Sequence, residues 1–248
     1  MRNIRCTLAY AGTRYYGWQK ASDGPSIEET IQTCLEQILQ HKVKLQAASR
    51  TDRGVHAKGQ VINFFTDLPS LSLRRLHGSL KGLLPADISP LAVEQASDNF
   101  HPTLDNVGKE YHYEICTHSV QLPFDREFSW HYPYHPISHE KMNRGAKFLE
   151  GTHDFSAFTT AEVEDGVRTL EKCAIVPLEN GRLRIEIRGD NFLYKMVRTL
   201  AGTLVHVGSG KIPLPELPSL LKEKDRKLAG MTAPAHGLTL KEVFFPDR

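Results

Sequence analysis

Apolar residues recur at helical spacing in four stretches of the chain, and each stretch predicts an amphipathic helix. The first is the best defined, because Ser26 and Glu29 have the spacing of a capping box. Such a box satisfies backbone N–H groups at the start of a helix. We expect helices at residues 26–40, 71–84, 138–149 and 191–206.

Shorter stretches that are rich in β-branched and aromatic residues, or that alternate between apolar and polar residues, predict β-strands. The dipeptide Asn180-Gly181 separates two of them and favours the tight turn of a β-hairpin. We expect strands at residues 5–9, 43–47, 60–66, 91–95, 109–117, 168–177, 182–188 and 242–245.

The order of these elements indicates two similar α+β halves. The first hundred residues read β, α, β, β, α, β, and the remainder repeats this theme loosely. Helices that lie on one side of an antiparallel sheet are the simplest architecture for such an order. We therefore expect an N-terminal half at residues 1–105 and a C-terminal half at residues 106–248.

The composition is that of an ordinary globular protein, with 40% hydrophobic and 24% charged residues. It argues against a disordered, collagenous or coiled-coil chain. The four cysteines lie far apart without a CxxC pair, which argues against a zinc site or a disulfide framework. The sequence shows no signal-peptide pattern and no apolar run of the ~20 residues that cross a membrane, so we expect a soluble cytoplasmic protein. A net charge of +2 does not by itself indicate a nucleic-acid partner.

The densest group of reactive side chains lies at residues 50–56, between two predicted strands. Asp52 stands between Arg50 and Arg53, and two guanidinium groups favour the ionised carboxylate that a nucleophile or general base requires. Gly54 permits a backbone turn that other residues avoid. An ion-paired surface turn has the same composition, so the residues alone leave both interpretations open.

A second candidate group lies on the predicted helix at residues 191–206. Its buried face is apolar, whereas Asn191, Lys195 and Arg198 share the opposite face at i, i+4 and i+7. This face is either simply solvated, or Lys195 and Arg198 bind an anion, namely a phosphate or the carboxylate of Asp52.

The strand at residues 109–117 contributes aromatic candidates. Tyr111 and Tyr113 fall on one of its faces, and His112 falls on the other. Aromatic residues on a strand usually belong to the core, but a tyrosine that borders a basic cleft is able to stack on a nucleobase.

Known metal and nucleotide motifs are incomplete in this sequence. Residues 208–211, Gly-Ser-Gly-Lys, end like a phosphate loop but lack its first glycine and its magnesium-binding hydroxyl residue. His131, His135 and His139 are spaced four apart, but intervening prolines prevent the helix that would align them. We therefore expect a chemistry that needs no metal and no cofactor.

Residues 50–57 resemble the signature loop of the TruA family of tRNA pseudouridine synthases, in which the aspartate is catalytic. Further matches follow in the order of that family and extend over nearly the whole chain. They comprise Tyr10-Ala11-Gly12-Thr13-x-Tyr15-x-Gly17-Trp18-Gln19, Lys109-x-Tyr111-x-Tyr113, Gly151-Thr152-His153-Asp154-Phe155-Ser156-x-Phe158, Phe192-Leu193-x-x-Met196-Val197-Arg198 and Ala233-Pro234-Ala235-x-Gly237-Leu238-x-Leu240.

The resemblance implies that the protein isomerises uridine to pseudouridine at positions 38, 39 and 40 in the anticodon stem-loop of tRNA. It also implies a homodimer without a cofactor. Each subunit would have two α+β halves whose antiparallel sheets join across a positively charged cleft.

The resemblance further implies a role for each matching residue. Asp52 would break and remake the link between uracil and ribose, either by attacking a carbon atom or by removing a sugar proton. Arg50 would fill the space that the target base leaves, because the base must flip out of the stack before an aspartate reaches it. Tyr111 would stack on the flipped uracil, and Arg198 would pair with Asp52.

Some positions depart from the family pattern. The family usually has Gly where this chain has Ser49, often Ala where it has Arg53, and commonly Asp where it has Ala11. It typically has an arginine in the segment where this chain has Pro102 and Thr103. None of these positions is a catalytic candidate, so the departures concern how RNA is bound.

Two other functions compete with this interpretation. A non-catalytic RNA stem-loop binding protein would use only the basic loop and the tyrosines, but a buried carboxylate repels phosphates. A metal-independent nucleoside or glycoside hydrolase would combine Asp52 with a second carboxylate, Asp154 or Glu110, within ~5 to 10 Å. Free uracil among the products would indicate the hydrolase.

Overall fold

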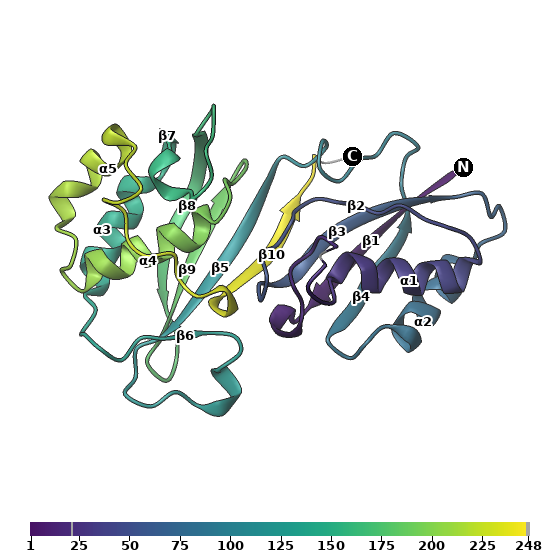
Figure 1. The fold of residues 1–248 in the computed structure, drawn as a ribbon, viewed down its shortest axis with the longest axis horizontal. Coiled ribbons are helices and arrows are strands. Elements are labelled where there is room, and N and C mark those ends of the chain that lie inside the picture. Colours follow the sequence, from purple (N-terminus) through teal and green to yellow (C-terminus); the bar gives the residue numbers. More distant parts are fainter. Residues whose placement is uncertain (21, 247–248) are drawn as a thin grey trace. The chain divides into compact units, whose positions relative to one another are not determined.

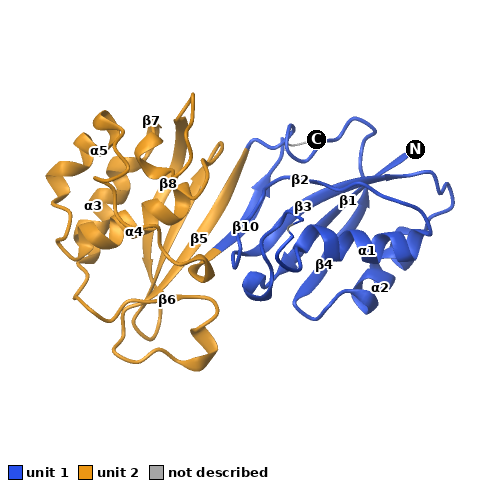
Figure 2. Ribbon diagram, viewed as in Figure 1, with its two compact units in different colours: residues 1–107, 239–248 blue, residues 108–238 orange. Residues whose placement is uncertain are grey.

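The computed structural model describes residues 1–20 and 22–246 and divides into two compact units. Unit 1 comprises residues 1–107 and 239–248, and unit 2 comprises residues 108–238 (Figure 2). The division expected from the sequence placed residues 106–248 together. The C-terminal strand joins unit 1 instead, because it pairs in parallel with a strand of that unit, with Thr239 opposite His56.

Unit 1 contains a sheet with the strand order β4-β1-β3-β10, and β2 pairs with β3. The pairs of β3 with β1 and β2, and of β1 with β4, are antiparallel. Helices α1 and α2 contact each other, and α2 also packs against β4 (Figure 1). The elements are β1 (Arg2–Tyr10), α1 (Ile27–Leu39), β2 (Gln46–Ala47), β3 (His56–Thr66), α2 (Leu73–Leu83), β4 (Ile88–Gln95) and β10 (Leu238–Phe244).

Helix α1 confirms the prediction made from its capping box. The Ser26 hydroxyl accepts a hydrogen bond from the backbone N–H of Glu29 at 3.2 Å. The helix buries Ile31 and Leu35 on one face, as the apolar spacing predicts. It ends at Leu39, and the next residue, Gln40, is left-handed with φ 59°.

Unit 2 contains a sheet with the strand order β5-β9-β8-β7, and β6 pairs with β5. Helix α3 packs against β8 and against α4, whose side chains are almost all buried. The elements are β5 (Gly108–Cys116), β6 (Trp130–His131), α3 (His139–Leu149), β7 (Gly151–Asp154), β8 (Val167–Pro177), β9 (Arg182–Gly189), α4 (Met196–Gly208) and α5 (Leu217–Glu223). Short 3-10 turns occur in both units, at Gly12–Arg14, Pro123–Asp125, Ser156–Phe158, Leu214–Glu216 and Ala235–Gly237.

The two faces of the unit 2 sheet differ in chemistry because neighbouring residues of a strand point to opposite sides. On β9, Leu183, Ile185 and Ile187 are buried, whereas Arg184 and Glu186 between them are partly exposed. Both units therefore combine helices with sheets, and the predicted α+β class is confirmed.

The cysteines of both units lie in the core. All four are free and buried. Burial raises the pKa of the Cys6 and Cys173 thiols to about 12, which keeps them protonated and unreactive at neutral pH. Within the described part of the chain, no helix is long and apolar enough to cross a membrane.

Several predicted elements begin at other residues than expected. Strands β3 and β10 begin four residues earlier than predicted, at His56 and Leu238. The strand expected at residues 43–47 is paired only at Gln46–Ala47, because the N–H of Val43 donates to the Glu36 side chain at 3.4 Å instead of to a strand. The helix expected from residue 191 begins at Met196.

The late start of α4 has a local cause. The N–H of Phe192 donates to the side chain of Asn191 at 2.9 Å, and Asp190 accepts from the N–H of Asn191. Side-chain acceptors of this kind compete with helical hydrogen bonds.

Candidate active site

The loop that carries Asp52 is a closed turn in unit 1. The N–H of Val55 donates to the carbonyl oxygen of Asp52 at 3.1 Å, and Gly54 has φ +79°. The left-handed value is the one that the sequence predicted a glycine to provide. Asp52 itself is half-buried, whereas Arg50 and Arg53 are exposed.

A buried glutamine anchors this loop just before the aspartate. Gln60 on β3 accepts from the N–H of Ser49 at 3.2 Å and donates its amide N–H to the carbonyl oxygen of Ser49 at 2.6 Å. The hydroxyl groups of Thr51 and Tyr10 lie 2.8 Å apart, and the Gln60 amide reaches Tyr10 at 3.4 Å. Because Gln60 is fully buried, its amide depends on these partners for its hydrogen bonds.

Two glycines let the segment after β1 approach the loop closely. Gly17 has φ +98°, and a Cβ atom added there would lie 2.8 Å from the carbonyl oxygen of Thr51 and 3.2 Å from the carbonyl carbon of Asp52. The N–H of Trp18 donates to the same Thr51 oxygen at 2.9 Å. Gly12 donates its N–H to Nδ1 of His56 at 3.0 Å. Backbone and side-chain contacts therefore hold the Asp52 loop from both ends.

The predicted tyrosines lie in unit 2. Tyr113 is fully buried and donates its hydroxyl to the carbonyl oxygen of Pro234 at 2.8 Å. Burial raises the pKa of Tyr113 well above its usual value, so the residue remains a neutral donor in the core. Tyr111 is 6% exposed and meets Phe192 edge to face, with ring centroids 5.1 Å apart. Of the two rings, Tyr111 is the less completely enclosed.

Arg198 lies in the first turn of α4 and is half-buried. Its Nε donates to the carbonyl oxygen of Ala233 at 2.8 Å, and the N–H of Ala233 donates back to the carbonyl oxygen of Arg198 at 3.1 Å. This reciprocal pair fixes the direction of the guanidinium.

Lys195 does not share a helical face with Arg198, so that part of the sequence prediction is wrong. It precedes α4 in the left-handed conformation with φ 59°, and its ammonium lies 4.7 Å from the ring centroid of Tyr194. The predicted site residues fall into two groups, with Arg50 and Asp52 in unit 1 and Tyr111, Lys195 and Arg198 in unit 2.

Comparison with known proteins gives the chain its family. A sequence model described as tRNA pseudouridine synthase matches residues 7–104 and 146–246. A protein named tRNA pseudouridine synthase A 2, from Protochlamydia amoebophila, is 48% identical over 249 residues, which is 99% of this chain and 95% of that protein. The chain belongs to the tRNA pseudouridine synthase family.

A second relative belongs to the same family. The tRNA pseudouridine synthase A of Bacillus pumilus is 41% identical over 250 residues, covering 98% of this chain and 99% of that protein. Among solved structures, a Cbf5-Nop10-Gar1 complex matches with a TM-score of 0.38 and 12% identity, over 97% of this chain and 59% of the matched chain. The segments matched by the tRNA pseudouridine synthase model include Asp52 and Arg198, whereas Tyr111 lies between them.

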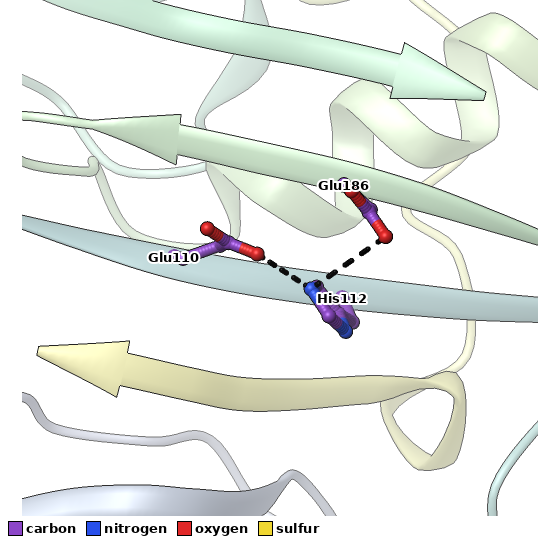
Figure 3. A group of neighbouring side chains, drawn as sticks. All are labelled: Glu110, His112 and Glu186. Atoms are coloured by element: carbon purple, nitrogen blue, oxygen red, sulfur yellow. Dashed lines mark hydrogen bonds and ion pairs between the residues drawn. The ribbon is translucent and has the colours of Figure 1, made fainter. Parts of the chain in front are cut away.

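A cluster of three ionisable side chains in this tRNA pseudouridine synthase went unnoticed in the sequence. Figure 3 shows Nε2 of His112 between two glutamates, 2.7 Å from Oε1 of Glu110 and 4.0 Å from Oε1 of Glu186. The alternation along β5 places Glu110 and His112 on one face, but the register that sets Glu186 opposite His112 is not readable from one sequence.

These three residues are the group in the described chain that best fits a cation, since their donor atoms lie within 4.8 Å of one another. Glu186 is already paired with Lys172 at 2.6 Å, and Arg184 lies 3.7 Å away. Lys172 and Arg184 therefore balance much of the negative charge of Glu186 that would attract a metal ion. Burial is the main cause that lowers the pKa of His112, so the imidazole is neutral at neutral pH.

The two carboxylates considered for a hydrolase have other partners. Glu110 binds His112, and Asp154 binds Lys224 and accepts a hydrogen bond from the N–H of Ser156 at 2.9 Å. Both carboxylates are therefore bound to structural partners within unit 2.

Proposed function

We propose that this protein isomerises uridine to pseudouridine at positions 38, 39 and 40 in the anticodon stem-loop of tRNA, with Asp52 as the catalytic residue. The observation that carries this proposal is the loop around Asp52, which the Gln60 side chain anchors on both backbone atoms of Ser49. The 48% identity to a protein named tRNA pseudouridine synthase A 2 supports the same function. A carboxylate needs a fixed position to act on one carbon atom of a bound nucleotide.

The reaction breaks the bond between ribose C1′ and N1 of uracil and forms one between C1′ and C5. C5 loses its proton and N1 gains one, so the product is an isomer of uridine. Asp52 would assist by attacking a carbon atom or by removing a sugar proton. Either route requires the uridine to leave the base stack, which costs a few kcal/mol. Arg50 is exposed two residues before Asp52, where its side chain is able to replace the flipped base.

The residues of unit 2 would complete the site. Arg198 would form an ion pair with the Asp52 carboxylate, and the fixed direction of its Nε supports a positioning role. Tyr111 would stack on the flipped uracil, and Lys195 would bind a phosphate of the tRNA. We further propose that the protein acts as a homodimer in the cytoplasm and needs no cofactor.

The test is to incubate the purified protein with an unmodified tRNA transcript that has uridine at positions 38, 39 and 40, and to map pseudouridine at single-nucleotide resolution. A transcript with cytidine at these positions is the control. We expect pseudouridine at the three positions in the first transcript and none in the anticodon arm of the second. Release of free uracil would instead indicate a hydrolase, and tight binding without modification would indicate a binding protein.

A further inference from the structure

The side chain of Arg53, directly after Asp52, is held on an aromatic ring. Its guanidinium carbon lies 3.9 Å from the ring centroid of Tyr16, which is within the distance of a strong cation–π contact. Arg53 is nevertheless exposed to solvent, and Tyr16 is half-buried. The arginine is therefore ordered at the surface beside the proposed catalytic loop.

The ring of Tyr16 is itself fixed in place. The N–H of Tyr16 donates to the carbonyl oxygen of Pro25 at 2.9 Å. The ring also packs against Gly24, where an added Cβ atom would lie 2.6 Å from Cδ2 of the tyrosine. Tyr16 thus forms a firm platform for the guanidinium.

No carboxylate in the described part of the chain neutralises Arg53. Throughout residues 1–20 and 22–246, the structure gives this side chain no ion pair and no hydrogen bond. A guanidinium that stacks through its face keeps its N–H groups in the plane, where they point outward from the ring. The edge of Arg53 is therefore available to an anion from outside the protein.

We propose that Arg53 binds a backbone phosphate of the tRNA next to the uridine on which Asp52 acts. The inference rests on the proposed function, which places that uridine at Asp52. The Cα atoms of residues 52 and 53 are about 3.8 Å apart, so a side chain of this length reaches the phosphates that flank the target nucleotide. Arginine binds phosphate through two parallel hydrogen bonds, and stacking on Tyr16 lowers the entropy lost on binding.

The competing explanation is that Arg53 only stabilises the loop by covering Tyr16. The two explanations differ in their salt dependence, because each phosphate contact releases counterions. Loss of one contact makes the slope of log affinity against log salt less negative by about 0.7 to 0.9. A purely structural arginine leaves that slope unchanged.

The experiment measures tRNA affinity from low to high potassium chloride for Arg53→Ala and Arg53→Lys, each in the Asp52→Asn background to prevent turnover. We expect Arg53→Ala to weaken binding about tenfold at low salt and to make the slope less negative by about 0.7 to 0.9. Arg53→Lys keeps the charge, so it should weaken binding less and retain most of the slope.

The matched control is Lys42→Ala, which also removes one positive charge. Lys42 pairs with Glu36 at 2.7 Å. It follows the C-terminal end of α1, and this end lies about 18 Å from the start of the helix. We expect it to leave the slope unchanged. If Arg53→Ala showed the same salt slope as the Asp52→Asn protein with Arg53 intact, the proposed phosphate contact would be overturned. Failure of the wild-type enzyme to form pseudouridine would overturn the proposed function instead, and the salt slopes would still report on Arg53.

Discussion

The side-chain amide of Gln60 binds both polar backbone atoms of Ser49, accepting from its N–H at 3.2 Å and donating to its carbonyl oxygen at 2.6 Å. A side chain of β3 thus pairs with the loop much as a neighbouring strand would. Asp52 follows three residues later, so its position depends on this buried amide.

Replacement of Gln60 by leucine should uncouple the loop from the sheet. We expect kcat for pseudouridine formation to fall roughly 100-fold, as for a misplacement of about 1 Å, while KM for tRNA changes little. Asn63→Leu is the control, because Asn63 is also fully buried on β3 but bonds to Asn3 at 2.8 Å. If both variants lose equal activity and equal stability in urea, general destabilisation explains the effect and Gln60 has no special role.

Gly17→Ala should disturb the loop from its other side. The φ of +98° and the 2.8 Å approach to the Thr51 oxygen both oppose a Cβ atom, so we expect a loss of about 1 to 3 kcal/mol in the free energy of unfolding and a lower kcat. Gly82→Ala on α2 meets no atom within 4 Å and should be neutral or stabilising. Urea unfolding and initial rates measure both effects; an unchanged kcat in Gly17→Ala would contradict the role given to this contact.

Arg198→Met should lower turnover far more than tRNA affinity if Arg198 positions the Asp52 carboxylate. A loss of roughly 100-fold in kcat is expected for such an electrostatic contact. Arg226→Met is the control, since Arg226 holds the neighbouring backbone by donating to the carbonyl oxygen of Gly230 at 2.8 Å. Equal losses of kcat in the two variants would show that Arg198 acts only by holding residues 230–233, and equal losses of turnover and affinity would indicate a phosphate contact.

His112 should make the protein less stable in mild acid. Burial lowers the pKa of His112 from its usual value of 6.5, and Arg184 adds to this, whereas Glu110 and Glu186 oppose it. The unfolded chain therefore takes up a proton more readily, and the free energy of unfolding falls as the pH drops below about 6.5. Urea unfolding at pH 7.5 and 5.5 should show a smaller pH effect in His112→Gln than in wild type or in the exposed control His135→Gln. An equal pH effect in all three proteins would contradict this assignment.

Local signals in the sequence predicted much of the fold. Ser26 and the apolar spacing after it define α1, and the left-handed φ values of Asn180 and Gly181 confirm the hairpin turn between β8 and β9. Long-range pairing was less accessible, because nothing within residues 239–244 specifies that β10 lies beside β3. The start of α4 was missed because side-chain hydrogen bonds of Asp190 and Asn191 replace helical ones.

The site was predictable to a similar degree. The residue types around Asp52 and the need for flexibility at Gly54 are visible in the sequence itself. The roles of Gln60 and Gly17 are not, because each arises from a contact with residues that the fold brings close. The family resemblance pointed to the catalytic candidates. The structure shows which contacts hold the loop that carries Asp52.

The most direct test of the account is the activity of Asp52→Asn, which preserves the shape of the side chain but removes its charge. Wild type and variant are incubated with unmodified tRNA, pseudouridine is mapped at each position, and tRNA affinity and urea unfolding are measured in parallel. We expect the variant to fold and to bind tRNA as wild type does, and to form no detectable pseudouridine. Pseudouridine formation by Asp52→Asn at a rate near that of wild type would show that another residue performs the reaction.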